Sequence, residues 1–307
     1  MRIAVIGAGG VGGAFGAALA HAGADVTFVA RGAHLKAMQE KGLRVESPRG
    51  DTHLVPTQAT DDPATIGPVD FVMFCVKLWD VESAGEKIKP LVGADTAVIT
   101  FQNGIDSHER LIPILGPKAV MPGVAQISAT IAEPGVIRQV GTFMRLVFGE
   151  LDGSRSNRAE AFLALCQKAG FDATHSKNIL VDLWMKFILL ASNASITAAT
   201  RKPLGLLRDD PEINPLFEHA YAEVVAVGRA KGIPLPEDAV QKTLGFNRGA
   251  PPTMMASMAH DLIRGNRIEL PWLGGKVVAL GRALGVPTPV QEVLYQVLKP
   301  YADPTAG

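Results

Sequence analysis

Glycines near the start of the chain have the spacing of a phosphate-binding turn. An apolar run at residues 2–6 is followed at once by Gly7, Gly9, Gly10, Val11 and Gly12, and then by an alanine-rich stretch. The first glycine of such a motif permits a tight turn, the second lets the backbone approach a pyrophosphate, and the last lets the helix pack closely on the strand. The helix N-terminus then offers amide donors to the phosphates. The order strand, turn, helix predicts a dinucleotide site, although any tight turn of this kind favours glycine.

The second predicted strand, residues 25–30, ends at Arg31. An acidic residue at this position bonds the ribose 2′-hydroxyl of NAD, whereas an arginine can pair with the 2′-phosphate of NADP. Asp25 stands at the beginning of the strand, which is the wrong end for that contact. The sequence therefore predicts NADP (NADPH) as the cofactor. The alternative is that Arg31 is an ordinary solvated turn residue.

Polar residues also follow two later apolar runs. Lys77 follows the run 70–76, and Asn103 comes shortly after the run 97–101 and directly before Gly104. Nearly continuous hydrophobicity is typical of parallel strands buried on both faces, and such sheets bind ligands at the carboxyl ends of their strands. We therefore expect Lys77 and Asn103 at the binding edge. The alternatives are a surface lysine and a simple Asn-Gly turn.

One lysine stands in a long apolar helical run. Lys186 occurs within residues 179–199. An ammonium buried without partners is costly, so this side chain must either reach the surface or face a polar cleft. On a helical wheel Asn193 and Thr197 lie within about 20° of Lys186. The sequence predicts a polar stripe along one face of this helix.

A second polar group lies nearer the C-terminus. Ser257 and Asp261 are one turn apart on a predicted helix, and Gly265 and Asn266 end that helix before Glu269. Arg264 belongs to the same group. The pattern alone does not distinguish these residues from ordinary surface side chains.

The elements that must position these residues fall into two halves. Alternating apolar runs and helical segments in the first half are typical of a doubly wound, mainly parallel α/β sheet. We expect strands at 1–6, 25–30, 70–76, 97–101, from 119 onward, 135–140, 144–148 and 172–175, and a helix at 159–170. Periodic apolar stretches predict helices at 179–199, 213–231, 253–264 and 272–285. The expected domains are a Rossmann-type domain at 1–176 and an all-α domain at 177–307, with a frayed tail at 300–307.

The composition excludes several classes of protein. The chain has 30 basic and 30 acidic residues, and no Lys/Arg cluster predicts a nucleic-acid surface. We find no stretch of the ~20 apolar residues that would span a bilayer, and the N-terminus lacks the apolar core of a secretion signal. Cys75 and Cys166 lie in apolar runs and are expected to be reduced, as in cytoplasm. The seven histidines show no metal-binding spacing.

Taken together, these features resemble the ketopantoate reductase (2-dehydropantoate 2-reductase) family over essentially the whole chain. The order and spacing of the matching residues are specific only in combination. They are the GAGGVG turn at 7–12, Ala30-Arg31, Val76-Lys77, Gln102-Asn103-Gly104, Glu133-Pro134-Gly135, Trp184-Met185-Lys186, Ser257-Met258 with Asp261 and Glu269, and the run 284–289.

The resemblance implies an NADPH-dependent reduction of a 2-oxo acid to a 2-hydroxy acid. The default substrate is 2-dehydropantoate, on the route to pantothenate and coenzyme A, and the helical domain is expected to be of the 6-phosphogluconate dehydrogenase-like type. Lys186 matches the general acid of the family, and Glu269 matches the acid that holds and tunes it. Ser257 matches a substrate contact, and Lys77 and Asn103 match groups near nicotinamide and substrate. An ammonium can stabilise and then protonate the alkoxide that hydride transfer leaves on the carbonyl oxygen.

The chain departs from the family pattern after the lysine. Asparagines four and eight residues after it contact substrate in the pantoate-forming members, and Leu190 and Ala194 stand at these positions here. Asn193 is the nearest amide and is expected to replace them in part. The departure leaves open a different 2-oxo acid, either bulkier or less polar.

Two other functions remain open, one enzymatic and one regulatory, and so does the oligomeric state. A β-hydroxyacid dehydrogenase likewise joins a Rossmann domain to helices and uses a lysine, but the spacings 184–186 and 257–269 speak against it. A catalytically silent NADPH-binding regulator would need neither Lys186 nor Glu269. The apolar helical half is compatible with a homodimer as well as with a monomer.

Overall fold

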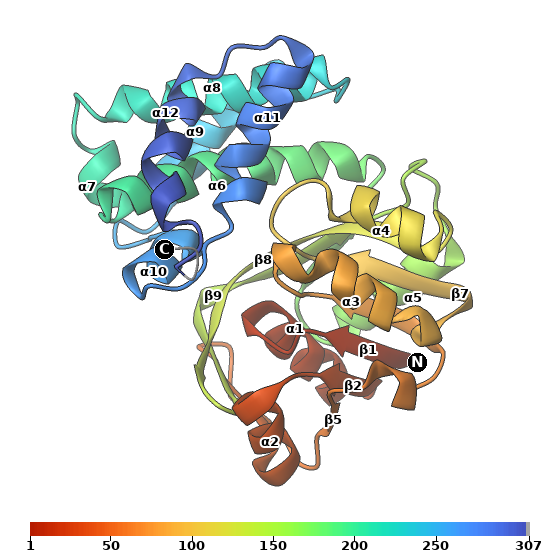
Figure 1. Ribbon diagram of the computed structural model, residues 1–307. Helices are drawn as coiled ribbons and strands as arrows, with labels where there is room; N and C mark the ends of the chain where they lie inside the picture. The colour runs from red at the N-terminus through yellow and green to blue at the C-terminus, as the bar shows by residue number, and fades with distance from the viewer. Residues whose placement is uncertain (305–307) are drawn as a thin grey trace. The chain divides into compact units, whose positions relative to one another are not determined.

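The first half of the chain forms a ten-stranded, mostly parallel sheet in the computed structural model, which describes residues 1–304 (Figure 1). The strand order is β4-β3-β9-β8-β7-β6-β1-β2-β5, and β10 pairs with β9. Only the pairs β8/β9 and β3/β4 are antiparallel among the described strands. The strands are β1 (Arg2–Ile6), β2 (Asp25–Val29), β3 (Leu43–Glu46), β4 (Thr52–Leu54), β5 (Gln58–Thr60), β6 (Val69–Phe74), β7 (Val92–Thr100), β8 (Val120–Glu133), β9 (Val136–Phe148) and β10 (Asp172–His175).

Helices cover both faces of this sheet, which explains why its central strands are apolar on both sides. One face packs against α1 (Gly10–His21), α2 (Gly32–Lys41) and α5 (Asn157–Lys168). The other packs against α3 (Val81–Lys87) and α4 (Ser107–Leu115). Short 3₁₀ turns complete the unit: η1 (Pro63–Thr65), η2 (Leu78–Asp80) and η3 (Lys89–Leu91). The expected doubly wound α/β fold is confirmed.

The second half is helical and has its own apolar core. Its elements are α6 (Ile179–Thr200), α7 (Leu204–Arg208), α8 (Asn214–Ala230), α9 (Ala239–Gly249), α10 (Ser257–Ile263), η4 (Leu270–Trp272), α11 (Gly274–Leu284), α12 (Pro289–Leu298) and η5 (Lys299–Tyr301). The core includes the fully buried side chains of Trp184 and Tyr221.

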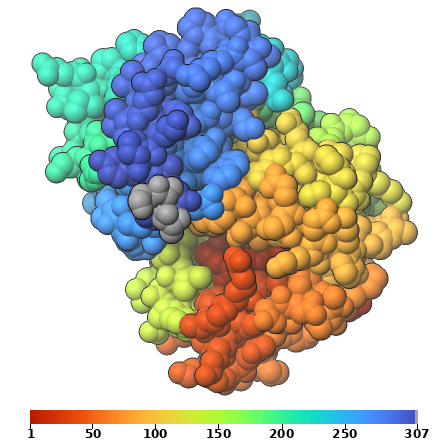
Figure 2. Space-filling model, in the orientation of Figure 1, coloured from red at the N-terminus to blue at the C-terminus, as the bar shows by residue number. Residues whose placement is uncertain are grey.

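The chain divides into two compact units. The first contains residues 1–102 and 106–179, and the second contains 103–105 together with the chain from residue 180 onward. In Figure 2 the surface of the first unit runs from red to yellow-green, and that of the second is green to blue. The short segment Asn103–Ile105 is thus part of the helical unit, although the residues on both sides of it belong to the sheet unit.

The structure corrects several sequence-based predictions. The expected strands 135–140 and 144–148 are one strand, β9, with a bulge at 140–143 that lies opposite Ser128. The positive φ of Gly141, 72°, allows that bulge. The predicted helix 253–264 begins only at Ser257. Several elements were not predicted at all: β3, β4, β5, α7, α9 and α12.

The expected tail at 300–307 is partly corrected. Residues 299–301 form η5, whereas residues 305–307 lie outside the described residues.

The expectation that no segment could span a membrane is also wrong for α6 on length and composition alone. This helix has 22 residues, and its most apolar 18-residue window has a mean hydropathy of 1.5. However, 61% of its most apolar window is buried within the structure, and Phe187, Ile188 and Ala191 belong to the core of the helical unit. The apolar character of α6 is therefore explained by core packing in that unit.

Candidate active site

The glycines in the turn between β1 and α1 have different surroundings. Gly7 has a φ of 94°, and a Cβ there would lie 2.9 Å from the Cys75 carbonyl oxygen. A Cβ on Gly10 would lie 2.1 Å from the Ala129 carbonyl oxygen, so that position is closed to any side chain. By contrast, a Cβ on Gly9 would meet nothing within 4 Å. Gly9 therefore faces open space beside the first amides of α1, as a backbone that cradles a pyrophosphate should.

Gly12 and Val11 complete this turn from inside the helix. A Cβ on Gly12 would lie 2.2 Å from the Gly7 carbonyl oxygen, so only glycine lets α1 approach β1 this closely. Val11 is partly buried and packs against the core on the α1 face of the sheet.

A histidine that the sequence analysis did not single out braces the same turn. His34 of α2 lies 2.8 Å from the Ala8 carbonyl oxygen through Nε2. Its Nδ1 accepts a hydrogen bond of 3.0 Å from the Gly135 amide, in the turn between β8 and β9. These two contacts require the neutral ring with its proton on Nε2. Burial lowers the pKa of His34, and the hydrogen bond to Ala8 offsets part of that effect.

Arg31 lies at the end of β2, as predicted, and stands at the N-cap of α2. Its side chain is 80% exposed, and its Nη2 lies 3.0 Å from Oδ2 of Asp80. Lys77 is also exposed and precedes η2, with its Nζ 5.6 Å from the ring centroid of Trp79. Two cations and one carboxylate therefore lie at the carboxyl edge of the sheet.

In the helical unit three polar side chains form one chain of hydrogen bonds. Lys186 of α6 donates from Nζ to Oδ1 of Asn103 at 3.1 Å. Asn103 in turn donates from Nδ2 to Oε2 of Glu269 at 3.3 Å. Glu269 is 5% exposed and lies directly before η4. An amide thus connects a buried carboxylate to a lysine, although the three residues are far apart in sequence.

Two opposing effects set the pKa of the Lys186 ammonium. Burial lowers the pKa of Lys186 to about 8, and the charge of Glu269 acts in the opposite direction. A lysine with its ordinary pKa near 10.5 is a weaker acid and transfers its proton less readily at neutral pH. The combination gives a group that is mostly charged at neutral pH and can still release a proton.

The predicted polar stripe on α6 turns inward. Asn193 is 8% exposed, and its Oδ1 accepts a hydrogen bond of 2.5 Å from the Tyr221 hydroxyl. Thr197 is fully buried and donates to the Asn193 carbonyl oxygen at 2.6 Å. Neither residue has a hydrogen bond to Lys186 among those described. Tyr221 escaped the sequence analysis because an isolated tyrosine in an apolar helix carries no distinguishing pattern.

The two departures from the family pattern lie on the same helix as the lysine. Leu190, one turn after Lys186, is partly exposed, while Ala194, a further turn along, is fully buried. Ser257 is exposed and is the first residue of α10. The side chain one helical turn after Lys186 is therefore the apolar Leu190.

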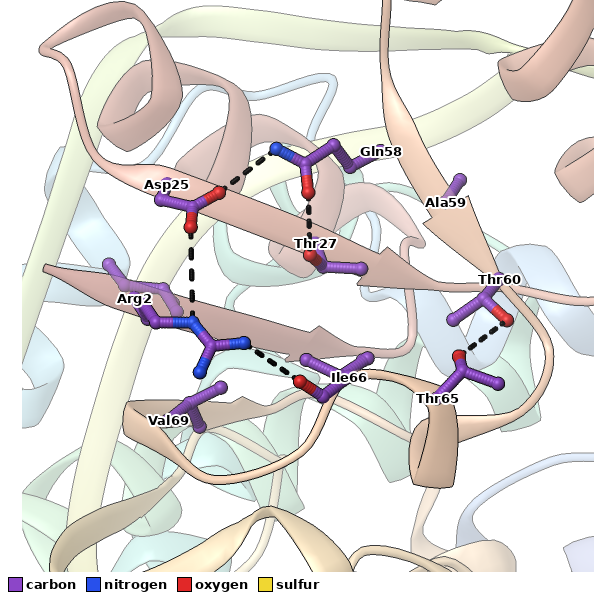
Figure 3. A pocket seen from close by; sticks show the side chains of 10 residues that line it. Arg2, Asp25, Thr27, Gln58, Ala59, Thr60, Thr65, Ile66 and Val69 are labelled. Atoms are coloured by element: carbon purple, nitrogen blue, oxygen red, sulfur yellow. Dashed lines mark hydrogen bonds and ion pairs between the residues drawn. The ribbon is translucent and has the colours of Figure 1, made fainter.

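Figure 3 shows a polar hollow elsewhere in the first unit, at the amino-terminal ends of β1 and β2. Its volume is about 360 Å³. Arg2 and Asp25 form an ion pair of 3.9 Å there, and Gln58 donates to Asp25 at 2.9 Å. The hollow lies at the opposite end of the strands from the glycine turn. Open α/β sheets bind ligands at the carboxyl ends of their strands, which is not where this hollow lies. Because these polar side chains pair with one another, we assign the hollow no ligand.

The fold and these groups define a class first. A dinucleotide-binding α/β unit joined to a helical unit is the architecture of a nicotinamide-dependent oxidoreductase. Residues 3–153 match the ketopantoate reductase PanE/ApbA family, and residues 178–302 match the ketopantoate reductase PanE/ApbA C-terminal domain. The chain belongs to the ketopantoate reductase family, whose members are dinucleotide-binding reductases.

Individual relatives match over almost their whole length. The 2-dehydropantoate 2-reductase of Mesorhizobium japonicum is 30% identical, with 97% of each chain covered. The crystal structure of a PanE/ApbA family ketopantoate reductase from Ralstonia eutropha is 31% identical and has a TM-score of 0.91, with 100% of each chain covered. The structure of D-mandelate dehydrogenase with NADH and anilino(oxo)acetate has a TM-score of 0.90 over 98% of each chain, but at 20% identity it shows the shared fold alone.

Proposed function

We propose that this protein reduces a 2-oxo acid to the 2-hydroxy acid with NADPH and that Lys186 is the general acid. The observation that carries the proposal is the partly buried chain of hydrogen bonds Lys186–Asn103–Glu269, in which the ammonium has a pKa of about 8. Glu269 would keep the lysine charged, and Asn103 would hold it in place.

The chemistry follows from where charge develops. NADPH, when bound, supplies the hydride that adds to the carbonyl carbon of the substrate. The carbonyl π electrons then move onto oxygen, and Lys186 stabilises the resulting alkoxide and transfers a proton from Nζ to it. The products are a hydroxyl group on the substrate and a neutral amine on Lys186, which regains its proton from solvent.

The residues of the glycine turn fit a dinucleotide. Gly7, Gly9, Gly10, Val11 and Gly12 would bind the pyrophosphate, chiefly through the open face at Gly9. We assign Arg31 to the 2′-phosphate, and Lys77 and Asn103 to the nicotinamide end of the cofactor. A neighbour of the same fold was crystallised with NADH, so NADH is the necessary comparison in any test.

For the substrate, 2-dehydropantoate is the default because several relatives are named 2-dehydropantoate 2-reductases. We assign Asn103 and Ser257 to substrate binding by resemblance. We add Asn193 as the nearest amide on the helical face of Lys186, and Tyr221 fixes its side chain. The apolar Leu190 favours a second candidate, a 2-oxo acid whose side chain is less polar than that of 2-dehydropantoate.

We also propose that the protein acts in the cytoplasm on a small molecule, without a nucleic-acid or membrane partner. The burial of α6 in a protein core removes the one described helix that could otherwise suggest a membrane. Within residues 1–304 no three His, Cys, Asp or Glu side chains gather as metal ligands, and the proposed chemistry needs none.

The test is oxidation of NADPH by the purified protein in the presence of 2-dehydropantoate and a panel of 2-oxo and 3-oxo acids, with NADH as the comparison cofactor. We expect turnover of a 2-oxo acid, and a kcat at least about a hundredfold lower in Lys186→Ala with little change in NADPH affinity. Activity confined to 3-oxo acids would contradict the proposed reaction. Unimpaired turnover by Lys186→Ala would remove the lysine from its role.

A further inference from the structure

The acidic residue Asp80 lies beside Arg31 at the carboxyl edge of the sheet, where the sequence analysis identifies only basic side chains. Arg31 follows β2, and Asp80 comes after β6 in the 3₁₀ turn η2. Both strands pair in parallel with β1, one on each side. The ion pair between Arg31 and Asp80, 3.0 Å long, therefore joins the two neighbours of the strand that ends in the glycine turn. It lies at the carboxyl edge, where the adenosine half of a dinucleotide binds in this fold.

The carboxylate of Asp80 is directed to the arginine and not to its own helix. Asp80 is the N-cap residue of α3, a position where aspartate commonly accepts a hydrogen bond from the first-turn amides. Its side chain makes no such cap here and instead contacts Nη2 of Arg31. The side chain of Asp80 is 26% exposed, so this charge is only partly screened by solvent.

The position of this carboxylate affects the two nicotinamide cofactors differently. NADP carries a 2′-phosphate at the ribose, whereas NAD carries a hydroxyl group that can donate to a carboxylate. A carboxylate beside Arg31 neutralises part of the positive charge that would attract the phosphate, and it repels the phosphate directly. The same carboxylate is an acceptor for the 2′-hydroxyl of NAD, the contact that an acid at the end of β2 makes in NAD enzymes.

We propose that Asp80 is a cofactor-selectivity residue that weakens 2′-phosphate binding at Arg31 and lets the protein bind NAD(H) as well as NADP(H). This inference rests on the proposed dinucleotide-dependent function. In NAD enzymes the acid that binds the ribose 2′-hydroxyl stands at the end of β2. In this protein Asp80, in the turn after β6, would take that role.

The experiment measures the Kd of NADP⁺ and of NAD⁺ by titration calorimetry, without substrate, for the full-length protein and three variants. Asp80→Asn removes the charge and keeps the size, and Asp80→Glu keeps the charge. Asp172→Asn is the matched control, because Asp172 pairs with Arg145 at 3.1 Å in β10, far along the sheet order from β1. For the unaltered protein we expect the two Kd values to lie within about tenfold of each other.

Asp80→Asn should raise the preference for NADP⁺ over NAD⁺ by about fivefold to tenfold, and the gain should shrink as salt is added. Asp80→Glu and Asp172→Asn should leave the preference nearly unchanged. An unchanged preference in Asp80→Asn would overturn the inference, as would a weaker affinity for NADP⁺, which would mean that Asp80 orients Arg31 for the phosphate. Failure of the unaltered protein to bind either dinucleotide would instead overturn the proposed function itself.

Discussion

At the scale of single residues, the most informative group is the ammonium of Lys186. Reduction of a 2-oxo acid requires the charged form, and the reverse oxidation requires the neutral amine. With a pKa of about 8, kcat/KM for reduction should be level at lower pH and should fall about tenfold per pH unit above pH 8. For oxidation of the 2-hydroxy acid, kcat/KM should rise with pH up to about pH 8 and be level above it, because the neutral amine then predominates. Profiles of both directions between pH 6 and 10 measure this pKa in the free enzyme.

Glu269 provides the control for this prediction. Its charge raises the pKa of Lys186 against the effect of burial, so Glu269→Gln should move the alkaline limb of the reduction profile to lower pH. The glutamine retains an acceptor for the Asn103 amide, so a merely structural role would lower activity without moving the limb. A limb that stays in place would exclude electrostatic tuning of the lysine by Glu269.

At this scale, the sequence identifies a functional residue where its polarity differs from that of its neighbours in the chain. Lys186 could be singled out because an ammonium in an apolar helix needs a reason. Asp80, His34 and Tyr221 could not, because acids in turns, histidines in helices and tyrosines in cores are ordinary. Their importance lies in partners 49, 26 and 28 residues away in sequence, and only the folded chain brings those partners together.

At the scale of elements, His34 connects three parts of the sheet unit. It lies on α2 and joins the glycine turn at Ala8 to the β8–β9 turn at Gly135. Protonation would place a second N–H on the ring, opposite the Gly135 amide, where an acceptor is needed. The pKa of His34 is lowered from 6.5 in the folded protein, so the unfolded chain takes up its proton first as the pH falls. The stability that the neutral ring contributes is fully present above pH 6.5 and is lost as the pH falls from there through the lower folded pKa.

We therefore expect the free energy of unfolding to fall between pH 7.5 and pH 5.5, and to fall less in His34→Gln, which retains an amide but cannot titrate. Urea denaturation at the two pH values measures the difference, and NADP⁺ affinity at each pH shows whether the glycine turn loosens with it. His53→Gln is the matched control, because His53 also bonds a carbonyl oxygen, that of Lys41, but does not touch the glycine turn. An equal loss of stability in the unaltered protein and in His34→Gln would refute this role.

The elements themselves were predictable in proportion to their periodicity. β1, β2, α5, α6 and α8 have strong apolar patterns and clear glycine or proline ends, and the sequence predicts each of them close to its observed bounds. α9 was missed because polar residues and glycines interrupt its pattern. The bulge at 140–143 made one strand look like two, since Gly141 is a turn signal in sequence and only the pairing with β8 shows that the strand continues.

At the scale of the whole molecule, the two units are not simply the two halves of the chain. A boundary near residue 176 follows from the change from α/β to helical patterns, but no pattern indicates that three residues of the first half belong to the second unit. Asn103 and Ile105 lie in a loop after β7, and the loop's sequence resembles an ordinary turn. In the structure Asn103 bonds Lys186 and Glu269, and Ile105, which is 4% exposed, belongs to the core of the helices.

Because residues 103–105 belong to the helical unit, we expect a core substitution in this loop to destabilise that unit and not the sheet unit. Ile105→Ala should lower the stability of the helical unit by about 2–4 kcal/mol, through lost burial and the cavity that remains. Hydrogen exchange followed by mass spectrometry should show reduced protection in α6 and α8, and little change in β1 and β2. Leu111→Ala is the matched control: Leu111 lies six residues further along the chain and is fully buried, but it belongs to the core between the sheet and α3 and α4. That variant should reduce protection in the sheet unit. If Ile105→Ala instead reduced protection only in the sheet, residues 103–105 would belong to the first unit, and the support of Lys186 by Asn103 would have to be reconsidered.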